Sequence, residues 1–589
     1  MKRLLFTMIV LMVCVLGKAQ DTIIVSLDLP GSLETTIAQI DENAKYNTAS
    51  LKVQGPLNGQ DMMFIREMCG VLGLNTKTQG VLSVLDLADA EIMPSDEPYM
   101  SVYGIDYTSH VNEFGPFFLY NCDNLTELTL PQGISVIDTM AFAGCSNLKE
   151  LELPGTLHEI GMGAFINCNK IQRLIVPDGV TELGIGAFQR MEALEELTLG
   201  NGISEIENSI VVMDNSLRII NLGFRFLTFN PVVFYNTPTL EQLNVDEKNP
   251  YYVSVDGVLF SSSLDTLVTF PPAYPAEHYV IPEDVHTLAP YSFYNASLLQ
   301  SVDLAAVNVV DTMAFFQCTA LENVTGGEAL TTIRFGAFGV IMGEEPALAA
   351  FHLPASLSNL DGGAFYGNYM ISPDIDSDNP YYTTDENGLL YTKDFTKLCF
   401  VPGLTESFSL PETVTTIGEY AFTGTLALPE IYLPDHVTTI CDGAFAFALG
   451  TEVIVLGNNI NKVGTQVIDY CVSLKDLYLF TQDIPDDNLA EYSFLDESGT
   501  TMEQCVLHVM PGRTETYLMK KGFYSEEYEM FFFADIAEID SPDKIRQVVT
   551  QQQMKIPAYY GIDGTRRQKL QKGLNIISLP EGNIKLGVR

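Results

Sequence analysis

Apolar residues recur along this chain with a step of 23 residues. A Leu-Pro or Val-Pro pair marks the step at 130–131, 153–154 and 176–177, and pairs in the same phase return at 410–411 and 433–434. A phenylalanine column keeps a fixed phase to these pairs, and a cysteine column lies three residues further on. Their members are Phe142, Phe165, Phe188, Phe293, Phe315, Phe338, Phe365, Phe422 and Phe445, then Cys145, Cys168, Cys318 and Cys471, with Cys122 slipped by one residue. A fixed period of this length predicts a stack of similar coils.

One unit, residues 148–168, shows how each coil is expected to fold. Leu148, Leu151 and Leu153 follow the L-x-x-L-x-L spacing of a leucine-rich repeat, and their alternation with polar residues predicts a β-strand. A proline ends the strand because it has no amide proton to donate. Phe165 is expected to enter the core from a short helical turn. Since one coil cannot bury these side chains alone, the sequence predicts a repeat solenoid of about 23 residues per coil.

Two units are longer than the others. Each carries Asn-Pro-Tyr-Tyr and then an Asp-Gly or Asn-Gly pair between apolar runs, which predicts a β-hairpin. The expected boundaries are an N-terminal cap over 20–111, the repeats over 112–495 with the long units at 246–281 and 376–410, a C-terminal cap over 496–540, and a small β segment over 541–589.

The first residues have the pattern of a secretory signal peptide. Lys2 and Arg3 precede an apolar run over 4–16, and the small residues Gly17 and Ala19 then stand at a cleavage position. The run is too short to span a bilayer, and no other segment is long and apolar enough. We therefore expect a signal peptide over 1–19, no transmembrane segment, and a secreted or outer-surface location.

The charge is strongly negative, with a formal net charge of −44. Such a surface repels phosphate backbones, so nucleic acid is not an expected partner. Solubility is the simplest role for this charge, and divalent-cation binding or attraction to basic proteins are the alternatives. The last fifty residues are basic instead, with Arg566, Arg567, Lys569 and Lys572 close together. This tail is either a plain β extension or a segment for sorting or surface attachment.

The combined columns and the two Asn-Pro-Tyr-Tyr units resemble the BspA-type leucine-rich-repeat family, over roughly residues 30–540. Residues 51–68 with 82–92 are similar to the amino-terminal cap of these proteins, and 505–518 to their closing strand. The tail resembles the terminal segments of surface proteins sorted by the type IX system, although it is shorter and lacks a lysine-rich end. The resemblance implies a secreted or surface protein of mouth or gut bacteria that adheres to host proteins or other cells, and it supplies no binding residues.

Catalytic motifs are missing from the sequence. It has no G-x-S-x-G, H-E-x-x-H, P-loop or C-x-x-C pattern, and its seven histidines fall at unrelated phases of the repeat. We therefore expect no enzyme and no cofactor. The repeat cysteines are expected to be free core thiols, because neighbouring coils place them poorly for disulfides. Asp374, Asp376, Asp378 and Asp385 are spaced like a calcium loop, but Pro380 and a missing glycine count against a metal site.

The outward residues of the strands are the best candidates for a ligand face. They would line the inner sheet, which curved repeat proteins generally use for binding. The candidates are Thr129, Glu152, Thr198, Asn221, Asn244, Asp303, His352, Tyr432 and Tyr478. Their chemistry suits a host or bacterial surface protein, which favours an adhesin-like binder. The alternatives are a glycan-binding accessory protein, disfavoured by the lack of tryptophan, and a structural surface-layer component.

Overall fold

A computed structural model describes residues 22–206, 216–229, 237–341, 344–481, 483–525, 527 and 530–539, and the backbone of four strands between 558 and 588. The predicted signal peptide over 1–19 and much of the segment 541–589 lie outside the described residues. The chain divides into two compact units, Met1–Ser262 and Ser263–Arg589.

Unit 1 begins with a small αβ cap. Strands β1 (Ile23–Ser26), β2 (Ser50–Leu57) and β5 (Val84–Asp86) pair in parallel, and β10 (Glu127–Thr129) of the repeats continues this sheet. Helices α1 (Leu33–Ile40), α2 (Ala44–Asn47) and α3 (Gly59–Met68) lie among these strands in the chain. Helix α3 starts with a capping box, in which Asn58 and Asp61 bond each other's backbone N–H groups. Asp61 also accepts from Gly31 and Leu33, so one carboxylate ties α1 to α3.

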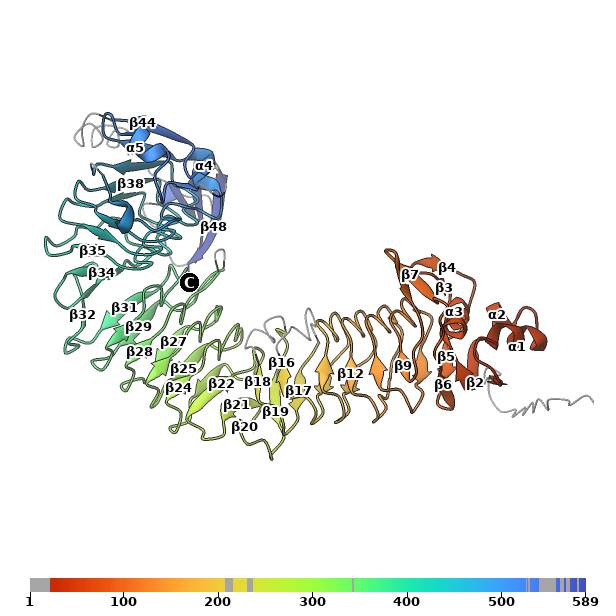
Figure 1. Cartoon of the computed structure of the whole chain (residues 1–589). Helices are drawn as coiled ribbons and strands as arrows, with labels where there is room; N and C mark the ends of the chain where they lie inside the picture. The colour runs from red at the N-terminus through yellow and green to blue at the C-terminus, as the bar shows by residue number, and fades with distance from the viewer. Residues whose placement is uncertain are drawn as a thin grey trace, which may run out of the picture. The chain divides into compact units, whose positions relative to one another are not determined.

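The repeats of unit 1 build two rows of short parallel strands; the strand predicted at Leu151–Leu153 is absent, and that coil has only an isolated bridge between Glu127 and Glu150. One sheet contains β13 (Arg173–Ile175), β15 (Glu196–Thr198), β17 (Ile219–Leu222) and β19 (Gln242–Val245); the other contains β9 (Glu113–Phe114), β11 (Val136–Ile137), β12 (Glu159–Ile160) and β14 (Glu182–Leu183). Paired residues such as Val136 and Glu159 are 23 positions apart, so each coil lies in register on the next. Figure 1 shows these strands side by side along the unit. The predicted leucine-rich-repeat solenoid is confirmed.

The phenylalanine column forms the centre of this core. The ring centroids of Phe114, Phe142, Phe165 and Phe188 follow one another at 4.8, 5.2 and 5.9 Å, with nearly parallel planes. The predicted leucine positions are buried as well, and Glu150 and Glu152 are exposed. Each ring therefore contacts the rings of the neighbouring coils, which explains why the column repeats with the period of the coil.

The segment around each phenylalanine differs from the expected helical turn. It is a run of tight turns in which two residues four positions apart have positive φ, such as Met140 at 52° and Gly144 at 83°. Alternate N–H groups bond within the coil, and the others point to the next coil. Met140, Phe142 and Gly144 donate to Met162, Ala164 and Ile166 at 2.9, 2.9 and 2.7 Å. The coils are thus joined by directional hydrogen bonds on this side as well as in the sheets.

The tight turns of the first coil, residues 115–122, have no preceding coil to supply donors, and the cap supplies them instead. The hydroxyl of Tyr99 donates to the carbonyl of Pro116 at 2.6 Å. The fully buried guanidinium of Arg66 donates to the carbonyl of Tyr120 at 3.0 Å and also to that of Gly73. Burial lowers the pKa of Arg66. These two side chains take the place of a missing coil, because a buried carbonyl without a donor is costly.

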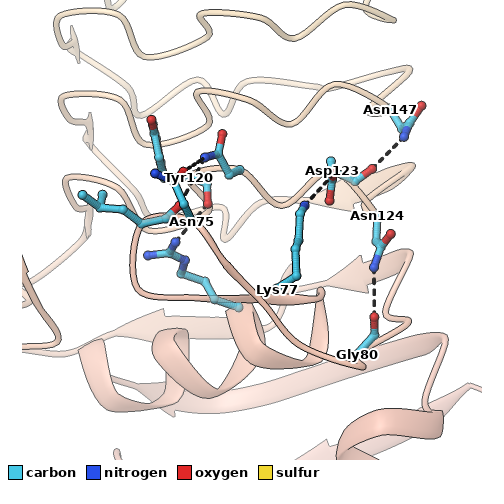
Figure 2. A network of polar contacts seen from close by, with 10 residues as sticks. Asn75, Lys77, Gly80, Tyr120, Asp123, Asn124 and Asn147 are labelled. Atoms are coloured by element: carbon cyan, nitrogen blue, oxygen red, sulfur yellow. Dashed lines mark hydrogen bonds and ion pairs between the residues drawn. The ribbon is translucent and has the colours of Figure 1, made fainter.

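A second set of contacts joins the same two regions at the surface. Figure 2 shows the cap residues Lys77 and Gly80 facing Asp123 and Asn124 of the first coil. Lys77 forms an ion pair with Asp123 at 2.7 Å, and the amide of Asn124 donates to the carbonyl of Gly80 at 2.9 Å. Asn147 of the next coil donates to the carbonyl of Asp123 at 2.7 Å. The network therefore continues from the cap into the second coil.

Both long units contain the hairpin that their turn pairs predict. In unit 1, β20 (Tyr252–Val255) pairs antiparallel with β21 (Val258–Ser261). In unit 2, β32 (Tyr382–Thr384) pairs with β33 (Leu390–Thr392), which pairs with β34 (Lys397–Phe400). The motif asparagines Asn249 and Asn379 are buried, and each amide donates to two carbonyls and accepts two N–H groups. The buried asparagine of each Asn-Pro-Tyr-Tyr motif therefore makes four hydrogen bonds.

Unit 2 repeats the same two-sheet plan. One side carries β23 (His278–Val280), β25 (Ser301–Asp303), β27 (Asn323–Thr325), β29 (Ala350–Leu353), β31 (Ser372–Ile375), β36 (Glu430–Tyr432), β38 (Val453–Leu456), β40 (Asp476–Leu479), β41 (Val506–Val509) and β44 (Asp535–Glu538). The other carries β24 (Thr287–Leu288), β26 (Val309–Val310), β28 (Thr332–Ile333), β30 (Asn359–Leu360), β35 (Thr416–Ile417), β37 (Thr439–Ile440) and β39 (Lys462–Val463). Near the end lie α4 (Thr500–Gln504) and α5 (Thr514–Leu518), and the tail forms an antiparallel sheet of β45 (Ala558–Gly561), β46 (Arg566–Arg567), β47 (Gly573–Leu579) and β48 (Gly582–Val588).

The nine cysteines of the described residues are free thiols, as predicted. Four members of the cysteine column donate their S–H to a carbonyl of the preceding coil. The pairs are Cys145 to Leu119, Cys168 to Phe142, Cys318 to Phe293 and Cys471 to Phe445, at 2.9–3.3 Å. Burial raises the pKa of Cys168 and of Cys318 to about 12. These thiols act as small apolar residues with one donor, which explains why cysteine recurs at this position.

Candidate binding faces

Three of the predicted face residues form one polar ladder in unit 1. Thr198, Asn221 and Asn244 lie in register on β15, β17 and β19. The amide of Asn244 donates to the amide oxygen of Asn221 at 3.1 Å, and that of Asn221 donates to the hydroxyl of Thr198 at 3.0 Å. Asn221 also donates to Glu196 at 3.0 Å. Because cross-strand hydrogen bonds fix these side chains, the ladder presents a preformed polar surface.

A groove runs along the ends of these strands. It has a volume of about 520 Å³, and its lining includes the three ladder residues, the exposed side chain of Ile175, and the loops that follow each strand. Two of the loops are joined, because Asp178 accepts the backbone N–H of Asn201 at 2.9 Å and its side-chain amide at 3.0 Å. These hydrogen bonds lower the pKa of Asp178. The groove therefore has a rigid wall and offers both polar and apolar contacts.

Asp178 and Asn201 were not among the predicted face residues. Their signal in the sequence is a pair of loops in the same phase, Pro-Asp-Gly at 177–179 and Gly-Asn-Gly at 200–202. The same contact recurs in unit 2, where Asp435 accepts the backbone N–H and the side-chain amide of Asn458 at 2.9 and 3.0 Å. An aspartate followed one coil later by an asparagine is thus a loop anchor of this fold.

The corresponding strand positions near the end of unit 2 are aromatic or aliphatic. Tyr432, Val455, Tyr478 and His508 lie in register on β36, β38, β40 and β41. Tyr478 stacks on the ring of His508 at 4.1 Å, and His508 contacts Asp476 at 2.7 Å. Tyr478 is only 7% exposed, which differs from the expected exposed position. His508 belongs to this row but was missed, because it follows Tyr478 by 30 residues and breaks the 23-residue phase.

Four other predicted face residues lie outside the polar ladder of unit 1 and the row of Tyr432 to His508 in unit 2. Thr129 and Glu152 are exposed in unit 1, Thr129 on β10 and Glu152 in an extended segment outside the ladder. In unit 2, Asp303 accepts the backbone N–H of Ala305 at 3.0 Å. The ring of His352 lies 3.1 Å from a carboxylate oxygen of Asp374 at the surface. The predicted face is therefore divided into separate patches within each unit.

The aspartates spaced like a calcium loop serve local structure. Asp374 pairs with His352, and Asp376 accepts the backbone N–H of Asp378 at 2.8 Å. Asp385 accepts the N–H groups of Asn387 and Leu389 in the hairpin turn. Within the described ranges, no three His, Cys, Asp or Glu side chains are grouped to hold a metal ion.

An aromatic ledge in unit 2 was not predicted from the sequence either. We use this name for Phe335, Tyr366, Tyr420, Phe447 and Tyr470, whose neighbouring ring centroids are 4.7–5.5 Å apart. All except Phe447 are partly exposed. Burial raises the pKa of the neighbouring Asp469 to about 6, with a further contribution from Glu497. These residues lie next to the phenylalanine column. A single sequence shows no preference for aromatic residues at these positions, so it did not indicate the cluster.

Comparison with known proteins identifies the repeat. The model of the BspA type leucine rich repeat region matches six copies over residues 112–241, 275–372 and 393–499, more than half of the chain. This chain belongs to the BspA-type leucine-rich-repeat family. No curated protein matches it significantly. In the part of the chain that the structure describes, no helix combines the length and apolarity needed to cross a membrane.

Solved structures with a similar fold come from several bacteria. The pneumococcal vaccine antigen PcpA is 19% identical with a TM-score of 0.33, over 71% of this chain and 80% of that one. A leucine-rich repeat protein from Eubacterium ventriosum is 18% identical with a TM-score of 0.35, over 61% and 80%. Another from Bacteroides ovatus is 19% identical with a TM-score of 0.28, over 63% and 76%.

Proposed function

We propose that this BspA-type protein is an adhesin-like binder of host or bacterial surface proteins at the cell surface, and that the groove of unit 1 is its contact region. The observation that carries the proposal is the polar ladder of Thr198, Asn221 and Asn244, which is held in place by its own hydrogen bonds. A fixed polar row beside an exposed isoleucine suits a protein partner, because little side-chain entropy is lost on binding. The matched family is a repeat family, and the chain has no catalytic motif.

The test is a binding screen of the purified full chain on arrays of host matrix proteins and bacterial surface proteins. Asn244→Arg places a bulky charge in the groove, and we expect it to weaken a detected interaction at least about tenfold, as hot-spot changes do. Thr181→Arg is the matched control, because it adds the same charge at an exposed position near β14. Equal weakening by both variants would exclude the groove as the contact region.

Glycan binding is the second candidate, and the aromatic ledge favours it. Partly exposed tyrosines beside carboxylates can stack on sugar rings and accept hydrogen bonds from their hydroxyl groups. A glycan array separates the two candidates: Tyr420→Ala and Tyr366→Ala should reduce glycan binding, while Asn244→Arg leaves it unchanged. Loss of protein binding in the ledge variants would instead place the protein contact in unit 2.

Attachment to the outer surface is the function proposed for residues 541–589. Their basic cluster is the supporting observation, since positive charge at the end of an acidic chain can dock to an acidic receptor or an anionic surface. Deletion of 541–589 in the native host, followed by fractionation, tests this. We expect the folded repeats to be shed or retained inside the cell envelope, and unchanged surface display would disprove the proposal.

A further inference from the structure

Two strands near the end of unit 2, β38 and β40, are buried on both faces. All four residues of β38 are buried, and so are the last three of β40, whereas β10 and β13 alternate between exposed and buried residues. The outward side chains form an apolar cluster separate from the main core. Its members are Val453, Val455, Tyr478 and Phe480, with Tyr432, Met510 and Ile539 packed against them. We call this cluster the apolar strip. A strand that is apolar on both faces requires a covering layer on each face.

The end of the chain leads directly to this strip. Strand β44 is the last strand of the sheet, it ends at Glu538, and the next residue, Ile539, packs on the strip. Fifty residues follow, among them the antiparallel sheet β45–β48. Eighteen residues separate Ile539 from β45, which is enough chain to reach about 60 Å. Five paired strands are only about 20 Å wide, so the terminal sheet can reach any part of the strip.

The terminal sheet has a face that suits this surface. Its register places Ile577 opposite Ile584, and Asn575 opposite Leu586, so Ile577, Ile584 and Leu586 share one face. A sheet with an apolar face must bury that face against another layer. The strip is an apolar surface that lies next to the start of this segment, because Ile539 packs on it.

The charges are complementary as well. Glu430, Asp476 and Asp535 stand at the first positions of β36, β40 and β44, which places an acidic edge beside the strip. The terminal segment carries the basic residues of β46 and the loop that follows it. Opposite charge on the two surfaces favours one orientation of docking and weakens with salt.

We propose that the terminal sheet β45–β48 docks within the same molecule on the apolar strip of unit 2. The docked sheet covers the outward face of β36, β38 and β40, so ligand binding is confined to the remaining patches. Release of the sheet would expose the apolar side chains of the strip to other molecules. The segment 541–589 is thereby a covering layer of the solenoid, which goes beyond its proposed role in attachment.

Hydrogen exchange of the full chain tests this directly. We expect the amides of β47 and β48 to exchange slowly in the parent and at least about tenfold faster in Tyr478→Asp, together with faster trypsin cleavage at Arg566–Lys572. Ile175→Asp is the matched control, because it places the same charge at the corresponding strand position in unit 1, where the side chain is already 67% exposed. It should leave the exchange of β47 and β48 unchanged.

A variant in the terminal sheet provides a second test if Tyr478→Asp does not fold. Ile577→Asp leaves the repeats intact, and it should raise the binding of an apolar fluorescent dye to the same level as deletion of 541–589. Unchanged protection of β47 and β48 in a folded Tyr478→Asp protein would overturn the proposal. So would a concentration-dependent dimer of the full chain that dissociates in Tyr478→Asp, since the occupant of the strip would then be a second copy.

Discussion

Two rows of side chains on the same type of sheet carry opposite chemistry. In unit 1, Thr198, Asn221 and Asn244 hydrogen-bond to one another and stay partly exposed. In unit 2, Val455 and Tyr478 occupy the corresponding positions and are buried. The inward columns beneath both rows are alike, with Phe165 and Phe445 almost completely buried. The repeat therefore determines the core, while the outward positions are free to acquire different functions.

The largest expected effect should be the same beneath both rows. Phe165→Ala and Phe445→Ala each remove a buried ring, and each should destabilise its unit by about 3–5 kcal/mol. Hydrogen exchange should accelerate first in the coils on either side of the change, because each coil contacts only its neighbours. Exchange that rises evenly along the whole chain would contradict this, and a large difference between the two variants would show that the cores are unlike.

Exchanging Val for Thr in one row and Thr for Val in the other should change the free energy of unfolding by different amounts. Val455→Thr places a hydroxyl in the apolar strip and should cost about 1–3 kcal/mol in the free energy of unfolding. Thr198→Val removes the acceptor of Asn221 and should cost only about 1 kcal/mol, because Asn221 keeps Glu196 as a partner. Denaturant unfolding of both variants measures the difference. Equal costs would mean that Val455 is solvated like Thr198.

Lowering the pH should stabilise unit 2 through Asp469 and destabilise unit 1 through Asp178. The pKa of Asp469 in unit 2 is raised to about 6, so its folded form binds a proton more readily than the unfolded chain, and stability is gained as the pH falls from about 6 towards 4. The pKa of Asp178 in unit 1 is lowered by Asn201, so its contribution is lost only as the pH falls below about 4. Melting temperatures of Asp469→Asn and Asp178→Asn between pH 3 and 7 measure both contributions. An unchanged pH profile in Asp469→Asn would contradict the first expectation.

Calcium should have the smallest effect on either unit. The carboxylates of Asp376 and Asp385 already accept backbone N–H groups, and the described residues group no metal ligands. Millimolar calcium should therefore leave the melting temperature nearly unchanged, since only binding to the folded state raises it. A clear rise that disappears in Asp376→Ala would establish a site in the second long unit.

The sequence correctly predicted the positions that are buried in the core. Leu151, Phe165 and Cys168 are buried, and the ring of Phe165 stacks on the rings of the neighbouring coils, so the period alone indicates these core positions. The tight turns were missed because their positive-φ positions accept methionine, asparagine, arginine or glycine, as at Met140, Asn167, Arg190 and Gly163. The burial of Tyr478 could not be predicted, because an outward side chain is buried only by whatever packs over it.

The direction of the hydrogen bonds between tight turns has a consequence for how such chains change length. Each coil turns a row of donors towards the next coil and a row of acceptors towards the previous one, and only the first coil relies on Arg66 and Tyr99. Removal of one whole unit, such as 154–176, brings donors and acceptors back into register. Removal of half a unit leaves buried polar groups unpaired, at a cost of about 1–3 kcal/mol each. During evolution the array can therefore gain or lose whole coils, while the cap has to be kept.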